Sequence, residues 1–107
     1  MATITANDSV VTLISVHSCA PENQVALVSL LTSAAQDIYR NIPGFISASI
    51  HKSVDGLAVT NYAQWESLEH FEAAGTNPLV SPFVAQVKPL LTGFEAHLYG
   101  ISAVVHA

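Results

Sequence analysis

The stretch GFISASIHKSVDGLAVTNYAQW, residues 44–65, decides the fold because it holds two strand-like runs on either side of a hairpin signal. The runs at 45–53 and 57–65 are short and rich in residues that favour strands. The dipeptide Asp55-Gly56 between them is typical of a two-residue turn, because its residues tolerate a positive φ angle. This turn pairs Val54 with Leu57 and so predicts the register of an antiparallel hairpin.

The predicted register sorts the hairpin side chains onto two faces, because opposed residues share a face of the sheet. Ile50 is then opposite Asn61, and Ile46 is opposite Trp65. The whole face consists of Ile46, Ala48, Ile50, Val59, Asn61, Ala63 and Trp65. It is apolar apart from Asn61, so we expect it to meet the helices of the domain.

Asn61 is the single amide on this apolar face, and leaving a buried amide unpaired costs about 1–3 kcal/mol. Two interpretations follow: Asn61 hydrogen-bonds a backbone group or a buried water, or it orients the polar group of a ligand. Trp65, on the same face, either packs in the core or forms the wall of a pocket. Together the two residues indicate an apolar pocket with one polar anchor, the usual form of a small-molecule site.

The opposite face of the hairpin is semi-polar and nearly uncharged. It consists of Phe45, Ser47, Ser49, His51, Ala58, Thr60, Tyr62 and Gln64. Such a surface suits burial against the same sheet of a second copy, and we therefore expect a homodimer.

The rest of the chain adds elements on both sides of the hairpin. Residues 10–18 are predicted to form a strand, and Pro21 opens a helix that runs to about Arg40. This helix carries one apolar stripe, formed by Val25, Val28, Leu31, Ala35 and Ile38. The remaining elements are helices at 66–74 and 78–91 and a strand at 94–105. The order βαββαβ predicts one α+β domain over residues 1–107, with a ferredoxin-like four-stranded antiparallel sheet covered by helices on one face.

Composition narrows the class of protein. Half of the 107 residues are hydrophobic and only 10% are charged, which excludes a disordered chain. The net charge of −5 disfavours nucleic acid as a partner, because phosphate would be repelled. So little charge on so apolar a chain also suggests that part of the monomer surface is hidden in a homo-oligomer.

The sequence predicts a cytoplasmic protein without a membrane segment. Cys19 is the only cysteine, so no disulfide can form within the chain. Residues 1–9 are polar and carry no basic side chain, which is unlike a signal peptide. The apolar stretch at 25–35 is too short to cross a bilayer.

The five histidines show no metal-ligand spacing, and we expect no metal site. No glycine-rich phosphate loop is present, so the residues predict neither a flavin nor a nicotinamide site. We expect Cys19 in a loop and not as a nucleophile, and His70 on the solvent side of a helix. His17, His51 and His97 are placed in strands, where each is either a candidate base or part of the semi-polar face.

The block from Gly44 to Ala73 resembles the core of the antibiotic biosynthesis monooxygenase family. The run Asn61–Ser67, NYAQWES, after a PGF…DG hairpin carries the resemblance, and it is most similar to the quinone-forming enzymes of aromatic polyketide pathways. The resemblance implies a dimeric α+β barrel. It also implies oxidation of an electron-rich phenol- or anthrone-type substrate by O₂, without flavin, haem or metal.

The quinone-forming members use an Asn and a Trp that match Asn61 and Trp65. The resemblance implies that Asn61 hydrogen-bonds the oxygen of a substrate anion and that Trp65 stacks on its ring. The pocket is expected between this face, including Ile46 and Ile50, and the helices that carry Phe71 and Phe83.

This chain lacks two further features of the family pattern. Phe71 stands where a tyrosine is expected, and Lys88 is the only basic residue near an expected arginine. Gly75 stands where haem-degrading members have a histidine, which disfavours haem degradation. The alternatives to an oxygenase are a ligand-binding or stress-related barrel, and a cofactor-free isomerase or lyase on the same fold.

Overall fold

The computed structural model describes residues 9–107. Residues 1–8, on which the prediction about a signal peptide rests, lie outside this part. The strands are β1 (Val11–Cys19), β2 (Phe45–Lys52), β3 (Ala58–Trp65) and β4 (Leu91–Tyr99). The α-helices are α1 (Gln24–Asp37), α2 (Leu68–Ala74) and α3 (Val80–Val87), with short 3₁₀ turns η1 (Pro21–Asn23), η2 (Tyr39–Asn41) and η3 (Lys88–Leu90). The predicted βαββαβ order is confirmed.

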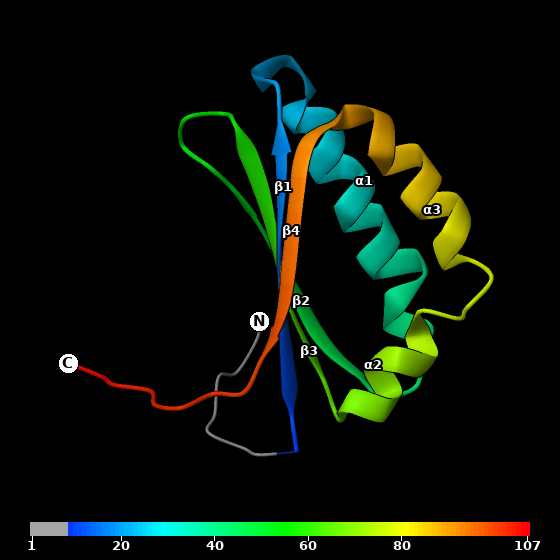
Figure 1. Cartoon of the computed structure of the whole chain (residues 1–107), viewed down its shortest axis with the longest axis vertical. Coiled ribbons are helices and arrows are strands. Elements are labelled where there is room, and N and C mark those ends of the chain that lie inside the picture. The colour runs from blue at the N-terminus through cyan, green and yellow to red at the C-terminus, as the bar shows by residue number, and fades with distance from the viewer. Residues whose placement is uncertain (1–8) are drawn as a thin grey trace.

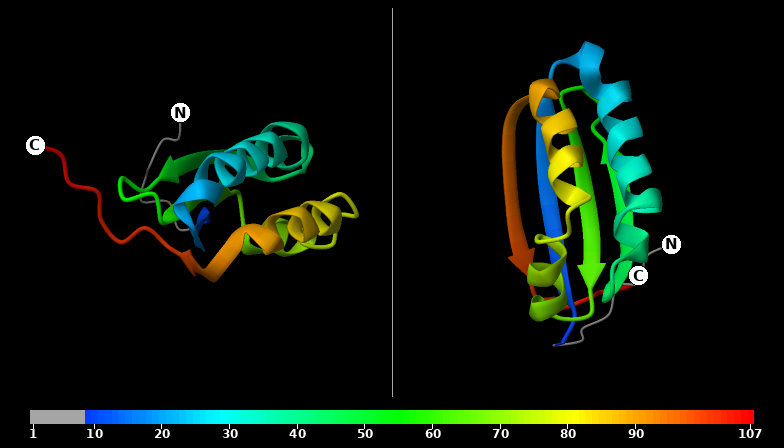
Figure 2. Two further views of the ribbon diagram at one scale, coloured as in Figure 1. Left: turned by 90° about the horizontal axis from the view of Figure 1, so that it is seen from above. Right: turned by 90° about the vertical axis from the view of Figure 1, so that its right-hand side faces the viewer.

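The four strands form one antiparallel sheet in the order β2-β3-β1-β4. All helices cover the same face, and α1 and α3 lie side by side across it (Figures 1 and 2). This arrangement is the predicted ferredoxin-like α+β fold. It leaves the opposite face of the sheet without a layer of helices.

The last strand is shorter than predicted. It ends at Tyr99, and residues 100–107 have no regular structure and extend away from the sheet (Figure 1). The reason lies in β1, because Tyr99 pairs with Thr12, next to the first residue of that strand. Only Val11 of β1 remains beyond this pair, so residues after Gly100 have no neighbouring strand to pair with.

The β2–β3 hairpin has the predicted register but not the predicted loop. The Ser53 N–H group donates to the Ala58 carbonyl oxygen at 2.9 Å, so the loop has four residues instead of two. The pairs Ala48–Ala63, Ile50–Asn61 and Lys52–Val59 are nevertheless as expected. Removing one residue from the end of each strand lengthens the loop without shifting the pairing.

Asp55 and Gly56 still shape this loop. Gly56 has φ +81°, and the Asp55 carboxylate accepts hydrogen bonds from the Ser53 hydroxyl (2.7 Å) and the Leu57 N–H group (3.0 Å). These hydrogen bonds lower the pKa of Asp55, and the one from Ser53 has the largest effect.

A bulge at Ile46 changes the beginning of β2. Phe45 pairs with Trp65 and Ser47 pairs with Gln64, which leaves Ile46 without an opposed residue. The predicted pairing of Ile46 with Trp65, and the placement of Phe45 on the opposite face, are therefore wrong. The bulge turns the Phe45 ring towards the helices, 5.3 Å from the Trp65 ring, and leaves Ile46 44% exposed.

Helix α1 packs through a broader apolar surface than the predicted stripe. Leu31 is buried, Val28 and Ile38 pack against the core and Ala35 lines the cavity, as predicted. Leu27 and Ala34 are also buried, whereas Val25 is 80% exposed. The segment VALVSLL is apolar at most positions, so more than one helical stripe satisfies the spacing. Only the packing of the helix on the sheet selects the stripe.

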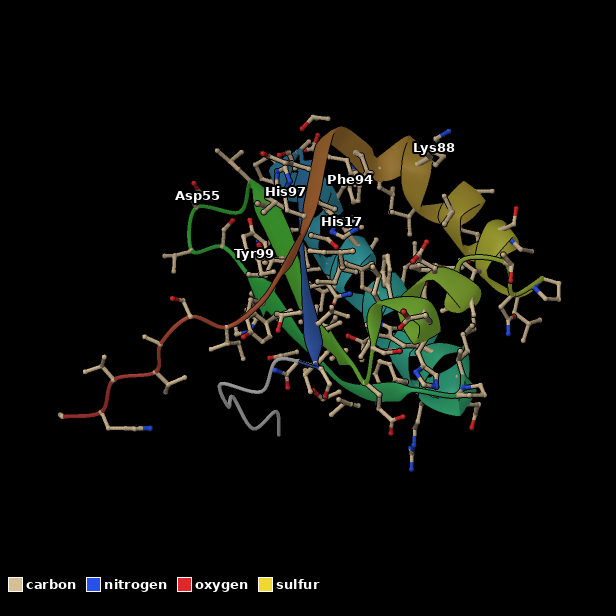
Figure 3. The ribbon with its side chains drawn as sticks, turned by 60° about the horizontal axis from the view of Figure 1, so that its bottom comes forward. His17, Asp55, Lys88, Phe94, His97 and Tyr99 are labelled. Carbon is tan, nitrogen blue, oxygen red and sulfur yellow. The ribbon has the colours of Figure 1, made fainter. Side chains whose placement is uncertain are left out.

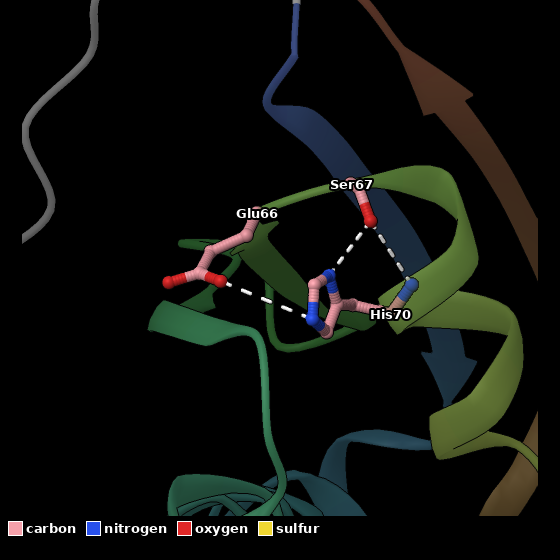
Figure 4. A network of polar contacts seen from close by, with 3 residues as sticks. All are labelled: Glu66, Ser67 and His70. Atoms are coloured by element: carbon pink, nitrogen blue, oxygen red, sulfur yellow. Dashed lines mark hydrogen bonds and ion pairs between the residues drawn. The ribbon is translucent and has the colours of Figure 1, made fainter.

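His70 belongs to the junction between β3 and α2 and is not a free surface side chain. Ser67 caps α2, because its hydroxyl accepts from the His70 N–H group at 3.1 Å and lies 2.7 Å from His70 Nδ1 (Figure 4). His70 Nε2 is 4.0 Å from Glu66. Gly44, with φ +87°, lies against the ring, and a Cβ atom there would overlap it.

Candidate active site

A cavity of about 570 Å³ lies between the sheet and the helices. Cavities that take drug-sized ligands measure roughly 300–1,000 Å³. Its wall is mostly apolar and is formed by Leu13, Ser15, His17, Leu31, Ala35, Tyr39, Phe45, Ala48, Asn61, Ala63, Trp65, Phe71, Glu72, Ala74, Gly75, Val80, Phe83, Val84, Val87, Lys88, Leu91, Phe94 and Ala96.

One part of the wall is a cluster of aromatic rings around Trp65. The rings of Phe45, Tyr39 and Phe71 stand edge-on to the indole, with centroid distances of 5.3, 6.3 and 6.3 Å. Tyr39 also meets Phe83 edge-on at 6.1 Å. Trp65 is only 2% exposed, so it belongs to the core and to the cavity wall at once. The cluster gives the cavity flat apolar surfaces suited to an aromatic ligand.

A short polar strip crosses the floor of the cavity. Ser15 of β1 pairs with Asn61 of β3, and His17 lies two residues further along the same face of β1. Ser15 and His17 are 4% and 7% exposed. These three side chains are the polar groups that the two central strands present to an otherwise apolar space.

Asn61 has spare hydrogen-bonding capacity. Its Oδ1 atom is buried and has no hydrogen-bond partner among the described residues. The other buried side-chain oxygens in this state belong to Thr12 and Ser47, which lie on the opposite face of the sheet. The interpretation that a backbone group satisfies Asn61 is therefore not supported. The Asn61 Nδ2 group also makes no hydrogen bond to a described residue, so its N–H groups can donate to a molecule in the cavity.

His17 is held in one tautomer. Its Nδ1–H group donates to the Val59 carbonyl oxygen at 3.2 Å, because a carbonyl oxygen can only accept. The neutral ring then carries a lone pair on Nε2. The Phe94 ring stands edge-on to the imidazole at 5.0 Å. Burial lowers the pKa of His17 below 6.5, although the hydrogen bond to Val59 raises it in part.

The charged residues of the cavity wall are Glu72 and Lys88, and both are exposed. Figure 3 shows His17 and Phe94 on neighbouring strands and Lys88 on the helical side of the sheet. Tyr39 adds a phenol, and burial raises its pKa. The phenol of this cavity therefore comes from η2, which follows α1, whereas the α2 position expected to hold a tyrosine has Phe71.

The structure brings four of the six predicted site residues together. Asn61, Trp65, Phe71 and Phe83 line the cavity. Ile50 faces the helices but packs in the neighbouring core, near Leu27, Leu31 and Val59. Ile46 is exposed at the bulge, so its assignment to the pocket is wrong.

Sequence reasoning overlooked Tyr39 and Phe45 and did not separate His17 from the other strand histidines. The alternation of β1 offered one signal, since His17 shares a face with Leu13 and Ser15. Cys19 is the last residue of β1 and not part of a loop. It is 2% exposed in the core.

Two further findings concern the described residues 9–107. None of the helices there is both long and apolar enough to cross a membrane. No group of three or more His, Cys, Asp and Glu side chains in this part is placed to hold a metal ion.

Comparisons with known proteins agree with this geometry. The profile described as antibiotic biosynthesis monooxygenase matches residues 10–86. The chain is 43% identical over 82 residues to the tetracenomycin-F1 monooxygenase of Streptomyces glaucescens, covering 77% of this chain and 73% of that protein.

Solved structures show the same fold. The monooxygenase from the gene ActVA-Orf6 of Streptomyces coelicolor, in complex with nanaomycin D, has a TM-score of 0.80 and 32% identity over 92% of each chain. SnoaB, a cofactor-independent oxygenase from Streptomyces nogalater, has a TM-score of 0.77 and 22% identity, covering 91% of this chain and 97% of its own. The chain belongs to the antibiotic biosynthesis monooxygenase family.

Proposed function

We propose that this protein is a cofactor-free monooxygenase that oxidises an electron-rich aromatic substrate of the anthrone or phenol type with O₂. The observation that carries the proposal is the apolar cavity of about 570 Å³ with the unpartnered Asn61 amide in its wall. The relative at 43% identity, named for the tetracenomycin F1 that it oxidises, supports the same class of reaction.

The shape of the cavity suits a flat polycyclic substrate. Tyr39, Phe45 and Phe71 surround Trp65, so a ring system that enters the cavity meets apolar surfaces. Trp65 then stacks on the substrate and holds it in place for reaction. Lys88, exposed at the cavity wall, is placed to attract a phenolate or carboxylate group of the substrate.

Asn61 stabilises the substrate anion. Removing a proton from an anthrone or phenol places negative charge on an oxygen atom, and an amide N–H group in an apolar cavity is a strong donor to that charge. Its side chain sits on a central strand, which fixes the position of the donor before the substrate arrives. The chemistry needs no bound cofactor, because the substrate anion itself supplies the electrons that reduce O₂.

We also propose that the protein works in the cytoplasm as a homodimer. The face of the sheet opposite the cavity has no helical layer and carries few charges, which suits packing against the sheet of a second copy (Figure 1). A dimer of this kind would close both sheets into the barrel that the family resemblance implies.

Oxygen consumption tests the proposed reaction. Purified protein is supplied with a panel of anthrones and polyhydroxylated aromatics in buffer free of metal and flavin. We expect O₂ uptake well above the uncatalysed rate for at least one substrate, with one O₂ used per product. Substrate conversion without O₂ uptake would instead identify an isomerase or lyase. Binding without conversion would identify a ligand-binding barrel.

A further inference from the structure

We propose that His17 is the base that removes the proton from the substrate, with Nε2 as the accepting atom. This assignment deepens the proposed oxygenase function and rests on it. His17 lies on the cavity wall and its ring is fixed by the hydrogen bond to Val59.

The position of His17 fits this role because it stands beside the oxyanion donor. Asn61 is paired with Ser15, and His17 follows Ser15 by two residues on the same face. Diagonal neighbours of this kind on paired strands have Cα atoms about 7–8 Å apart. One substituted aromatic ring spans that distance, so the substrate oxygen can reach Asn61 while an acidic hydrogen on the same ring system reaches Nε2.

The tautomer of His17 also fits. The Nδ1–H group is used by the Val59 carbonyl oxygen, and Nε2 has no hydrogen bond to another described residue. A base in this state needs no rearrangement before it accepts a proton. Because burial keeps the pKa of His17 low, the ring is neutral at pH 7 and ready to react.

The other titratable groups near the cavity are less suited. On the described part of the wall they are Tyr39, Glu72 and Lys88. The partly buried Tyr39 phenol holds its proton more tightly than usual, because burial raises its pKa. Glu72 and Lys88 are exposed, and strands β2, β3 and β4 contribute no titratable side chain to the wall.

The other histidines of the strands and helices do not line the cavity. His51 bonds to Ser49 and His97 bonds to Glu95, both on the opposite face of the sheet. His70 is engaged with Ser67 at the start of α2. Histidine 17 is therefore the one described histidine that shares the cavity with Asn61.

A weakly basic buried imidazole can still deprotonate the substrate, because both products are stabilised in the cavity. Asn61 hydrogen-bonds the substrate anion. The imidazolium ion that forms lies close to this anion, where the low dielectric strengthens their attraction. We therefore expect His17 and Asn61 to act as a unit, so that the effects of losing each are not additive.

For an anthrone, the CH₂ group is oxidised in three stages. A C–H bond of the CH₂ group breaks, the proton moves to Nε2, and the electron pair stays on the substrate. The anion reduces O₂ and forms a C–O bond, and the resulting peroxide takes the proton back from His17. Loss of water then breaks the O–O bond and removes the second C–H proton. The net change converts CH₂ and O₂ into C=O and H₂O.

Hydrogen–deuterium exchange without oxygen tests this assignment directly. The probe is 1,8-dihydroxyanthrone, incubated anaerobically in D₂O with the protein, and deuterium in its CH₂ group is followed by mass spectrometry. We expect the wild-type protein to accelerate exchange and His17→Asn to lower the acceleration by about 10²–10⁴-fold, the usual contribution of a general base. Asparagine keeps a donor for the Val59 carbonyl oxygen. His106→Asn, in the exposed segment after β4, should behave as wild type.

The possible results test the role of His17 separately from the oxygenase activity. Exchange that is unchanged in His17→Asn, or absent in the wild type, would overturn the assignment of His17. Exchange that depends on His17 in a protein that takes up no O₂ would support the base and contradict the oxygenase. O₂ uptake that survives in His17→Asn would support the oxygenase and remove His17 from its mechanism.

Chemical rescue gives a second readout that a purely structural role would not move. In His17→Ala, added imidazole should enter the vacated space and restore at least part of the exchange rate. Asn61→Ala should gain nothing from imidazole, because it keeps its base. Failure of imidazole to restore any exchange in a His17→Ala protein that has a native circular dichroism spectrum would contradict the proposal.

Discussion

The two faces of the sheet place the same type of residue in two environments. His51 and His97 lie on the open face, where each is exposed and bonds to a neighbour on its own strand, Ser49 at 2.8 Å and Glu95 at 2.9 Å. His17 lies under the helices, is 7% exposed, and bonds through one nitrogen only. The face of the sheet therefore decides whether a histidine is exposed on the single chain or buried beside the cavity.

Asn61 extends this comparison to the amide. His51 and His97 on the open face have hydrogen-bond partners on their own strands, whereas the Asn61 oxygen on the cavity side is buried without a partner among the described residues. An unsatisfied buried amide costs about 1–3 kcal/mol, so its retention on an apolar wall points to a ligand. The helices cover one face of the sheet and so create the cavity there. The strand register decides which side chains lie on that face, and it therefore decides which residues can act on a ligand.

Among substitutions at residues other than His17, the largest effect is expected from Asn61→Ala. Loss of one preorganised donor to an oxyanion lowers turnover by about 10²–10³-fold, whereas stability should change little because the amide lacks a partner. The measurements are O₂ uptake and thermal unfolding. Asn41→Ala, which removes an exposed amide bonded only to the Asp37 carbonyl oxygen, is the control and should keep full turnover. Equal turnover in both variants would remove Asn61 from the mechanism.

A substitution on the open face should affect assembly and leave the cavity intact. Tyr62→Lys places a charge on β3 opposite the cavity, and a charge buried between two sheets should weaken the dimer by about thirtyfold, or ~2 kcal/mol. Val54→Lys, at a fully exposed position in the hairpin loop, should leave the dimer unchanged. Sedimentation equilibrium measures both. A wild-type protein that is monomeric at micromolar concentration would contradict the proposed homodimer.

A smaller effect is expected from Trp65→Phe. Phenylalanine keeps an apolar ring next to Phe45 but stacks less well on a substrate, so turnover should fall by about tenfold. Because Trp65 is also a core residue, the melting temperature should fall as well. Steady-state kinetics at a temperature well below unfolding separates the two effects. A variant that loses stability and keeps full turnover would assign Trp65 to the core alone.

The smallest effect concerns the pH dependence of stability. The pKa of His17 is lower in the folded than in the unfolded chain, so the unfolded chain binds the proton first as the pH falls below about 6.5. Stability should therefore decrease with falling pH there and level off once folded His17 also protonates. One group contributes at most about 1.4 kcal/mol per pH unit.

Urea unfolding at pH 5–8 measures this dependence. Below about pH 6.5, the free energy of unfolding should fall more steeply with decreasing pH for wild type than for His17→Asn. His106→Asn should show the same pH dependence as wild type. Identical pH profiles in wild type and His17→Asn would show that the imidazole is not buried in the way that the structure indicates.

The hairpin shows why much of the fold is predictable from the sequence. Asp55-Gly56 marks the turn, and any loop that grows equally at both ends keeps the same pairing, so Ile50 and Asn61 are opposed although the loop has four residues. The bulge at Ile46 is different. It depends on burial of Phe45 against Trp65, which is a tertiary contact that strand alternation does not contain.

The site residues likewise differ in whether the sequence alone predicts them. Asn61 is predictable because it is the one amide on a face defined by a local turn. His17 and Tyr39 are not, since the face of β1 is fixed by pairing with β3, far along the chain, and Tyr39 lies in a 3₁₀ turn after α1. Ile46 lies outside the pocket because of the bulge, which strand alternation does not predict.

Isotope incorporation from ¹⁸O₂ is the most direct test of the central claim that the covered face of the sheet is an oxygenase site without a cofactor. The protein, stripped of metal and flavin, is given 1,8-dihydroxyanthrone under ¹⁸O₂, and the product is examined by mass spectrometry at short times. We expect one ¹⁸O atom in each product molecule for wild type, and a rate at least a hundredfold lower for Asn61→Ala. Product that carries oxygen only from water, or labelled product formed equally fast by Asn61→Ala, would contradict it.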